Sequence, residues 1–128
     1  MNIPKDLSYA NSHEWVKVTG SVARVGISDF AQQELTDIVF VEVPKAGSIL
    51  TKGKECAVVE SVKTAADIYS PLSGRVVKLN QKVIDAPEIL NSDPYGDGWF
   101  FEMEISNSEE LNELLTADEY KETITTGK

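Results

Sequence analysis

The residue with the clearest chemical potential in this sequence is Lys63, a lone lysine between two apolar runs in residues 58–68. A lysine amine is most often a solvated surface charge, so only its position can give it a special role. An exposed amine on a rigid hairpin is what a modifying enzyme needs to form an amide with a long cofactor. The cofactor then performs the chemistry, and the protein supplies position and reach. The elements that flank Lys63 therefore decide between these two roles.

Two segments on either side of this stretch form an internal repeat. Residues 44–53 and 71–80 each contain Pro, two residues, Gly, one residue, two apolar residues, two more residues, and then Gly or Asn. The last positions, Gly53 and Asn80, are residue types that tolerate a left-handed backbone. Taken alone, residues 58–68 read as a helix, because they hold Ala, Glu, Val and Lys without a turn residue at the centre. The repeat instead predicts two turn–strand–turn units joined by a link, with Lys63 at the exposed tip.

Few other side chains are placed for catalysis. The chain has one histidine, His13, and one cysteine, Cys56, which argues against a metal site built from His and Cys. We expect His13 to be a surface or capped histidine, and Cys56 to be a buried structural thiol in an apolar strand. No Gly-rich phosphate loop or Gly-x-Ser-x-Gly nucleophile motif is present. Acids are plentiful, but spacing singles out no catalytic pair, so we predict a protein that is not an enzyme and holds no metal.

Length and composition fit one domain with a modest core: 128 residues, 41% of them hydrophobic. We expect a single domain over residues 1–128, with its core in about 14–105 and a C-terminal helical segment in about 107–124. The net charge of −9, from 12 basic and 21 acidic residues, argues against nucleic acid or an anionic membrane as a partner. No apolar run approaches membrane-spanning length.

The cellular setting follows from cysteine usage and the N-terminal residues. A lone cysteine allows no internal disulfide, and the first residues form neither a secretory signal nor an Arg-rich transit segment. We therefore expect a reducing compartment, the bacterial cytoplasm, with a mature mitochondrial form as the alternative. We also expect a monomer.

Alternating polar and apolar residues predict a β-hairpin, with strands at residues 14–18 and 22–27 around a Thr-Gly-Ser turn. A short helix is predicted at residues 30–35, where Asp29 and Gln32 resemble a capping box. Phe30, Ala31 and Leu35 give it an apolar face.

Three later segments complete the predicted core. The apolar run at residues 38–43 predicts a strand buried on both faces. Residues 81–98 are rich in Pro and Gly and predict loops, with one helical turn at residues 86–91. The aromatic and apolar residues 99–105 predict the last strand.

Two capping boxes predict helices at the C-terminus, Ser106 with Glu109 and Thr116 with Glu119. The predicted fold is a β-dominated α+β domain: two antiparallel sheets packed as a pseudo-symmetric sandwich or flattened barrel. It has an N-terminal hairpin, a short helix after that hairpin, and C-terminal helices. Lys63 is expected on a type I-like turn, because no residue there favours positive φ.

The motif Glu60-Ser61-Val62-Lys63, set in a β-repeat, resembles the attachment site of lipoyl domains. Further motifs, in order along nearly the whole chain, are similar to those of the glycine cleavage H-protein family. Such a spread of ordered motifs is highly specific, whereas Glu-Ser-Val-Lys alone is not. The matching stretches are Ser12-His13-Glu14-Trp15, Val25-Gly26-Ile27, Ala31-Gln32, Asp37-Ile38-Val39-Phe40-Val41-Glu42, Ala57-Val58-Val59-Glu60-Ser61-Val62-Lys63, Ser70-Pro71-Leu72-Ser73-Gly74 and Asn91-Ser92-Asp93-Pro94-Tyr95-Gly96-Asp97-Gly98-Trp99.

The resemblance implies that Lys63 carries lipoate through an amide, with Glu60, Ser61 and Val62 as the motif recognised by a lipoate ligase or a lipoyl/octanoyl transferase. It implies a lipoyl-domain-like barrel-sandwich hybrid that catalyses no step itself. Such a carrier takes the aminomethyl group of glycine from glycine decarboxylase (the P protein) to aminomethyltransferase (the T protein). Dihydrolipoamide dehydrogenase (the L protein) then reoxidises the dithiol.

The resemblance also implies a docking site for the loaded arm, which is a reactive aminomethyl thioether with a cationic amine. A cleft with hydrogen-bond acceptors and a carboxylate would protect this group from hydrolysis. The matching positions are Ser12, Glu14 and Asp67. We expect Glu14 and Asp67 to hold the ammonium. The competing interpretation makes Glu14 an ordinary exposed strand residue and Asp67 an ordinary polar residue of a hairpin.

Two departures from the family pattern bear on these expectations. Thr36 stands at the end of the short helix, where the family usually has Gly. A left-handed backbone there would disfavour a β-branched residue by roughly 1 kcal/mol or more. Glu102 and Glu104 stand in a strand that usually carries basic residues. If that face docks a partner, the changed charge favours a different one.

Two alternative functions follow. The first is an H-like protein that relays lipoyl groups to other 2-oxoacid dehydrogenases and has no part in glycine oxidation. The second, and weaker, is a biotin carrier. Those domains carry Met on both sides of the lysine, whereas Val62 and Thr64 flank Lys63 here.

Overall fold

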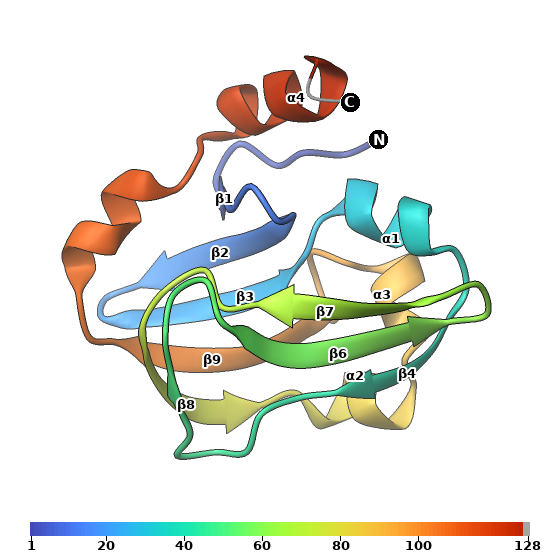
Figure 1. The fold of residues 1–128 in the computed structure, drawn as a ribbon, viewed down its shortest axis with the longest axis horizontal. Helices are drawn as coiled ribbons and strands as arrows, with labels where there is room; N and C mark the ends of the chain where they lie inside the picture. Colours follow the sequence, from blue (N-terminus) through green and yellow to red (C-terminus); the bar gives the residue numbers. More distant parts are fainter. Residues whose placement is uncertain (127–128) are drawn as a thin grey trace.

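The structure, a computed structural model, describes residues 1–126 and contains two antiparallel β-sheets (Figure 1). In order across the six-stranded sheet lie β1 (Ser8–Tyr9), β2 (Glu14–Thr19), β3 (Val22–Ile27), β9 (Trp99–Ile105), β8 (Gly74–Leu79) and β5 (Ile49–Leu50). The three-stranded sheet is formed in order by β4 (Ile38–Glu42), β6 (Glu55–Ser61) and β7 (Ala65–Tyr69). The predicted fold class, a β-dominated antiparallel sandwich with a few helices, is confirmed.

Helical segments lie at the ends and edges of this sandwich. They are α1 (Asp29–Leu35), α2 (Gln81–Asp85), α3 (Ile89–Ser92), the 3-10 helix η1 (Ser108–Glu113) and α4 (Ala117–Thr126). Figure 1 shows α4 beside the N-terminal segment and α1 close to the turn that joins β6 to β7. The C-terminal helix therefore lies on the same end of the molecule as the residues that begin β2.

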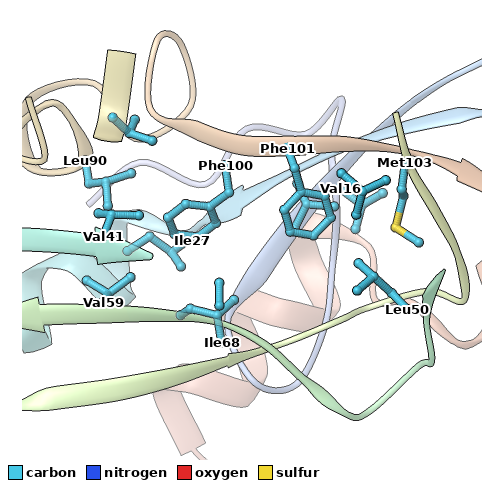
Figure 2. Packing of buried hydrophobic residues seen from close by; sticks show 14 of the residues in the cluster. Val16, Ile27, Val41, Leu50, Val59, Ile68, Leu90, Phe100, Phe101 and Met103 are labelled. Carbon is cyan, nitrogen blue, oxygen red and sulfur yellow. The ribbon is translucent and has the colours of Figure 1, made fainter. Parts of the chain in front are cut away.

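The main core fills the space between the sheets. Figure 2 shows Ile27 and Phe100 of the larger sheet pointing toward Val41, Val59 and Ile68 of the smaller one. All of these side chains are buried. Burial of such side chains is worth about 1.5–3 kcal/mol each, so this interface holds the smaller sheet in place.

The internal repeat has a structural counterpart, because its two strands pair with each other. Residue Leu50 of β5 lies opposite Gly74 of β8 in an antiparallel ladder. We expected the last residue of each repeat unit to have a left-handed backbone, and this is wrong for the second unit. Gly53 has φ 84, whereas Asn80 has φ −98. Asn80 is used differently: its side chain caps α2 by accepting a hydrogen bond from Lys82 N.

Strand β4 corrects a second expectation. Residues 38–43 are not buried on both faces, because Val39 and Phe40 are 55% and 44% exposed. The strand is an edge of the three-stranded sheet, and a register shift between Ile38 and Phe40 interrupts its pairing with β6. Only Ile38 and Val41 therefore face the core.

The helical segments differ from the sequence-based boundaries in several places. The N-cap of α1 is Ser28, which accepts from Ala31 N, while Asp29 accepts from the Gln32 side chain at 2.7 Å. Helix α2 was not predicted. The predicted helical turn at 86–91 is displaced to α3, which Asp93 follows.

The two C-terminal capping boxes have different outcomes. Thr116 and Glu119 form the predicted reciprocal pair, at 2.9 and 3.2 Å, and begin α4. The box of Ser106 and Glu109 is wrong, because Asn107 is the cap and a 3-10 helix follows. That helix cannot continue, because the next residues are drawn into a β-bridge between Leu115 and Tyr9.

Thr36 ends α1 in a backbone conformation that suits glycine. Its φ is 66 and its ψ is −146, and it is one of two non-Gly residues with positive φ among residues 1–126. The Asn91 side chain donates to Thr36 O at 2.8 Å and helps to hold this conformation. Such strain costs of the order of 1–3 kcal/mol at a β-branched residue.

We therefore expect Thr36→Gly to raise the free energy of unfolding by about 1 kcal/mol, after the greater flexibility of glycine in the unfolded chain is deducted. Urea denaturation at equilibrium measures this. The control is Thr51→Gly, an exposed loop threonine without positive φ, where glycine should be neutral or destabilising. Equal loss of stability in both variants would contradict the strain at Thr36.

Candidate functional site

Lys63 lies at an exposed hairpin tip between β6 and β7, as the repeat predicts (Figure 1). The hydroxyl oxygen of Ser61 accepts hydrogen bonds from Lys63 N at 3.1 Å and from Thr64 N at 3.0 Å. Ser61 N donates to Thr64 O at 2.7 Å. No residue of the tip has positive φ. One hydroxyl thus fixes the backbone on both sides of the lysine without a glycine.

The tip is also supported from the side. Val62 N donates to Asp37 O, in the connection between α1 and β4, at 2.9 Å. Asn91 fixes that connection, since it donates to Thr36 O at 2.8 Å and accepts from Ile38 N at 2.9 Å. Sequence reasoning placed Asn91 in a family motif and at the end of a helical turn, but not next to Thr36 or the hairpin tip. Its contacts join residues more than 50 positions apart.

A cleft of about 360 Å³ lies between α1 and β7. Phe30 and Glu34 of α1 line one side, Asp67 of β7 lines the other, and Ser12 lies at one end. Lys63 Nζ is 3.4 Å from Glu34 O, so the amine lies next to this cleft. The hairpin tip and the cleft therefore form one continuous site.

The three predicted docking residues have different positions. Ser12 and Asp67 are exposed and line the cleft. Glu14 is only 1% exposed and lies behind Ser12, whose hydroxyl donates to Glu14 Oε1. Tyr69 N donates to Glu14 Oε2 at 3.2 Å. The interpretation of Glu14 as an ordinary exposed strand residue is wrong. Strand β7 and the turn that contains Ser12 cover its side chain.

Burial raises the pKa of Glu14 from 4.5 to about 7, although the hydrogen bonds from Ser12 and Tyr69 N favour the charged form and lower it. Burial therefore favours the protonated form of this carboxyl group. A cation that entered the cleft would favour its ionised form. Burial also raises the pKa of the Cys56 thiol to about 12, so this half-buried cysteine is a structural thiol.

The raised pKa of Glu14 predicts a pH-dependent gain of stability in Glu14→Gln. Between about pH 4.5 and 7 the folded protein retains a proton that the unfolded chain has lost, so the Glu14 contribution falls as the pH rises. The variant should match the wild type near pH 4.5. The stability of the variant should exceed that of the wild type by about 3 kcal/mol above pH 7, since the pKa of Glu14 rises from 4.5 to about 7 and one pKa unit corresponds to ~1.4 kcal/mol. Urea denaturation across this range tests it, with Glu60→Gln as the matched substitution at an exposed glutamate.

Two other kinds of site are absent from residues 1–126. Residues 1–126 contain no group of three or more His, Cys, Asp and Glu side chains that could hold a metal ion. No helix in that range is long and apolar enough to cross a membrane. His13 is a capped histidine, with Nδ1 2.8 Å from the hydroxyl of Tyr120.

Comparison with known proteins shows the family of this chain. The family model described as glycine cleavage H-protein matches residues 7–127. The chain belongs to the glycine cleavage H-protein family. The H protein of Carboxydothermus hydrogenoformans is 50% identical over 122 residues, which cover 95% of this chain and 94% of that protein. That of Endomicrobium trichonymphae is 52% identical over 124 residues, which cover 97% and 100%.

A solved structure extends the comparison to the fold. The crystal structure of a glycine cleavage system H protein from Mycobacterium marinum has a TM-score of 0.86 and 38% identity, and the match covers 98% of this chain and 100% of that one. Membership of the H-protein family supports the role of a lipoyl-carrier protein in glycine cleavage.

Proposed function

We propose that this protein is the lipoyl carrier of a glycine cleavage system, with lipoate joined to Lys63 by an amide. It carries the aminomethyl group of glycine from the P protein to the T protein, and the L protein reoxidises the dithiol. The observation that supports this most strongly is an exposed lysine amine on a rigid tip beside a cleft with a buried carboxyl group. The proposed setting is a bacterial cytoplasm, and the proposed form is a single carrier domain.

The residues at the tip fit a covalently attached arm. Glu60 and Val62 are exposed beside Lys63, where an attaching enzyme can contact them. Ser61 holds the backbone so that the amine projects in one direction. Lipoate supplies a cyclic disulfide that accepts the one-carbon unit. The protein supplies the stiff mounting and the adjacent cleft.

The cleft residues fit the cationic end of a loaded arm. The cleft volume of about 360 Å³ falls in the range of small-molecule binding sites. The carboxylate of Asp67 lies at its rim, and the Glu14 carboxyl lies behind Ser12. An ammonium held near these groups would stabilise ionised Glu14, and the apolar surface of Phe30 would limit access of water.

Reconstitution tests the proposal. Lipoylated protein is combined with P protein, glycine and labelled bicarbonate, and carboxyl exchange into glycine is measured. We expect exchange that depends on lipoylation, and the unlipoylated protein is the control. No exchange by protein whose lipoylation has been verified by mass would favour the relay function instead.

The relay function rests on Glu102 and Glu104, and their surroundings weaken it. Glu102 pairs with Arg24 of β3 at 2.8 Å, and Glu104 pairs with Arg75 of β8 at 3.5 Å. Each acid lies opposite its arginine in the strand register. This face therefore carries both positive and negative charges. An acidic partner that binds the basic face of other family members could still bind here. Genes for P, T and L proteins beside this one would favour glycine cleavage over relay.

A further inference from the structure

A hydrogen-bond network joins the C-terminal helix to two parts of the cleft. The hydroxyl of Tyr120, on α4, is 2.8 Å from His13 Nδ1 and 2.7 Å from Ser28 Oγ. His13 lines the cleft from the turn before β2. Ser28 is the N-cap of α1, whose residues form one wall of the cleft next to His13. One hydroxyl therefore contacts the turn before β2 and the start of α1, which meet at the same end of the cleft.

The network is buried and closely packed. Tyr120 and Ser28 are both 0% exposed. The Tyr120 ring stacks on Tyr9, with ring centroids 4.7 Å apart, and the His13 ring packs against Phe30 at 5.0 Å. Burial raises the pKa of Tyr120 to about 12, so its hydroxyl remains neutral at physiological pH.

The position of α4 is itself fixed by contacts outside the cleft. Leu115 and Tyr9 exchange two backbone hydrogen bonds, of 2.7 and 2.9 Å, just before the helix begins. The capping pair of Thr116 and Glu119 then sets its first turn. The Tyr120 hydroxyl thus contacts His13 and Ser28 from a helix that does not line the cleft.

We propose that Tyr120 is a positioning residue that sets the width of the cleft at its Ser12–His13 end, by holding the His13 side chain against the start of α1, where Ser28 N also donates to His13 O at 2.9 Å. His13 has φ 81, a conformation that a non-Gly residue adopts only when its surroundings hold it. Without the hydroxyl, His13 relaxes and the N-terminal turn of α1 loosens. This proposal rests on the proposed carrier function, because the cleft must protect a loaded arm for its width to matter.

The test compares Tyr120→Phe with Tyr9→Phe. Both residues are 0% exposed and stack on one another, so each variant removes one buried hydroxyl and keeps its ring. The Tyr9 hydroxyl donates to Pro4 O at 2.7 Å, away from the cleft. The first readout is amide hydrogen exchange in the unmodified protein. We expect the Ser28 and Ala31 amides to exchange about 5-fold faster in Tyr120→Phe only, as loss of about 1 kcal/mol would give.

The second readout is hydrolysis of the loaded arm without T protein or tetrahydrofolate. Water supplies the oxygen of formaldehyde as the carbon–sulfur and carbon–nitrogen bonds break, and the products are one thiol, one formaldehyde and one ammonium ion. We expect this release to be roughly 5-fold faster in Tyr120→Phe than in Tyr9→Phe. Equal rates of exchange and release in the two variants would overturn the positioning role and leave Tyr120 as a packing residue.

Two further measurements separate failure of the positioning role from misfolding of the variant and from failure of the carrier function. If Tyr120→Phe does not fold, His13→Asn replaces it, because Asn tolerates positive φ but is too short to reach Tyr120. It should accelerate both readouts, and unchanged rates would overturn the proposal. If the lipoylated wild type accepts no aminomethyl group from P protein, the carrier function fails, while amide exchange still tests Tyr120.

Discussion

Lys63→Arg is expected to abolish attachment of lipoate and all carboxyl exchange, without a change in fold. Amide formation requires a nitrogen that can be deprotonated, and the guanidinium group stays protonated in proteins. Lys63 is exposed, and the tip is fixed by Ser61 and by backbone hydrogen bonds, so arginine fits without distortion. The expected effect is complete because no other amine lies at this tip.

Intact mass after expression with lipoate is the direct measurement, and circular dichroism verifies the fold. The matched control is Lys54→Arg, an exposed lysine in the turn at the other end of β6. It should acquire the full lipoyl mass and support normal exchange. A lipoyl mass retained in Lys63→Arg would place the arm on another amine, and the carrier site described above would be wrong.

Glu14→Ala is expected to accelerate loss of ammonia from the loaded protein by roughly 10-fold or more when folate is absent. Hydrogen bonds to charged groups contribute about 1.5–3 kcal/mol, and the buried carboxyl is the strongest acceptor next to the cleft. Its removal also leaves Tyr69 N and the Ser12 hydroxyl without their acceptor. The cleft then loses the negative charge of Glu14, and Ser12 and Tyr69 lose the contact that holds them in place.

Ammonia release over time from purified loaded protein measures this effect. Asp67→Ala, at the exposed rim, should give a smaller acceleration, because solvent screens the charge there. Glu55→Ala, also exposed but outside the cleft lining, is the control and should match the wild type. A wild-type rate in Glu14→Ala would refute its role in holding the ammonium.

The hairpin tip could be predicted from sequence because its cause is local. Two strand units that pair with each other, at residues 44–53 and 71–80, require a reversal of the chain between them. The Ser61 hydroxyl, which accepts from Lys63 N and Thr64 N, lies within the turn itself, so the turn forms without glycine. The paired capping residues Thr116 and Glu119 are predictable for the same reason, since both partners lie within one helical turn.

The burial of Glu14 could not be predicted from its own strand. Alternation along residues 14–18 places a glutamate among polar positions, and nothing nearby marks it as covered. It is buried by Tyr69, 55 positions away, and by the turn that holds Ser12. Tyr120 presents the same difficulty, because its partners His13 and Ser28 are 107 and 92 positions away. Local pattern indicates which residues are polar but not which ones the sheets bring together.

The two C-terminal capping boxes illustrate the limit further. Both have the same spacing of residues, yet only the pair at Thr116 begins an α-helix. At the first pair, Asn107 accepts from Glu109 N, and Ser106 N donates to Ser73 O, more than 30 positions away. Tertiary pairing outweighs a local helix signal that is worth only about 1 kcal/mol.

The hydrogen bond from Val62 N to Asp37 O has a consequence for how the arm is shared among enzymes. It ties the hairpin tip to the connection that follows α1, so docking of the proposed arm would be a ring closure within one rigid body. Its equilibrium is set by an effective molarity, typically millimolar for short flexible tethers, and not by the concentration of protein. Dilution therefore cannot free the arm. An enzyme that needs the loaded end must outcompete an intramolecular ligand, and it gains access only by offering the ammonium a better site.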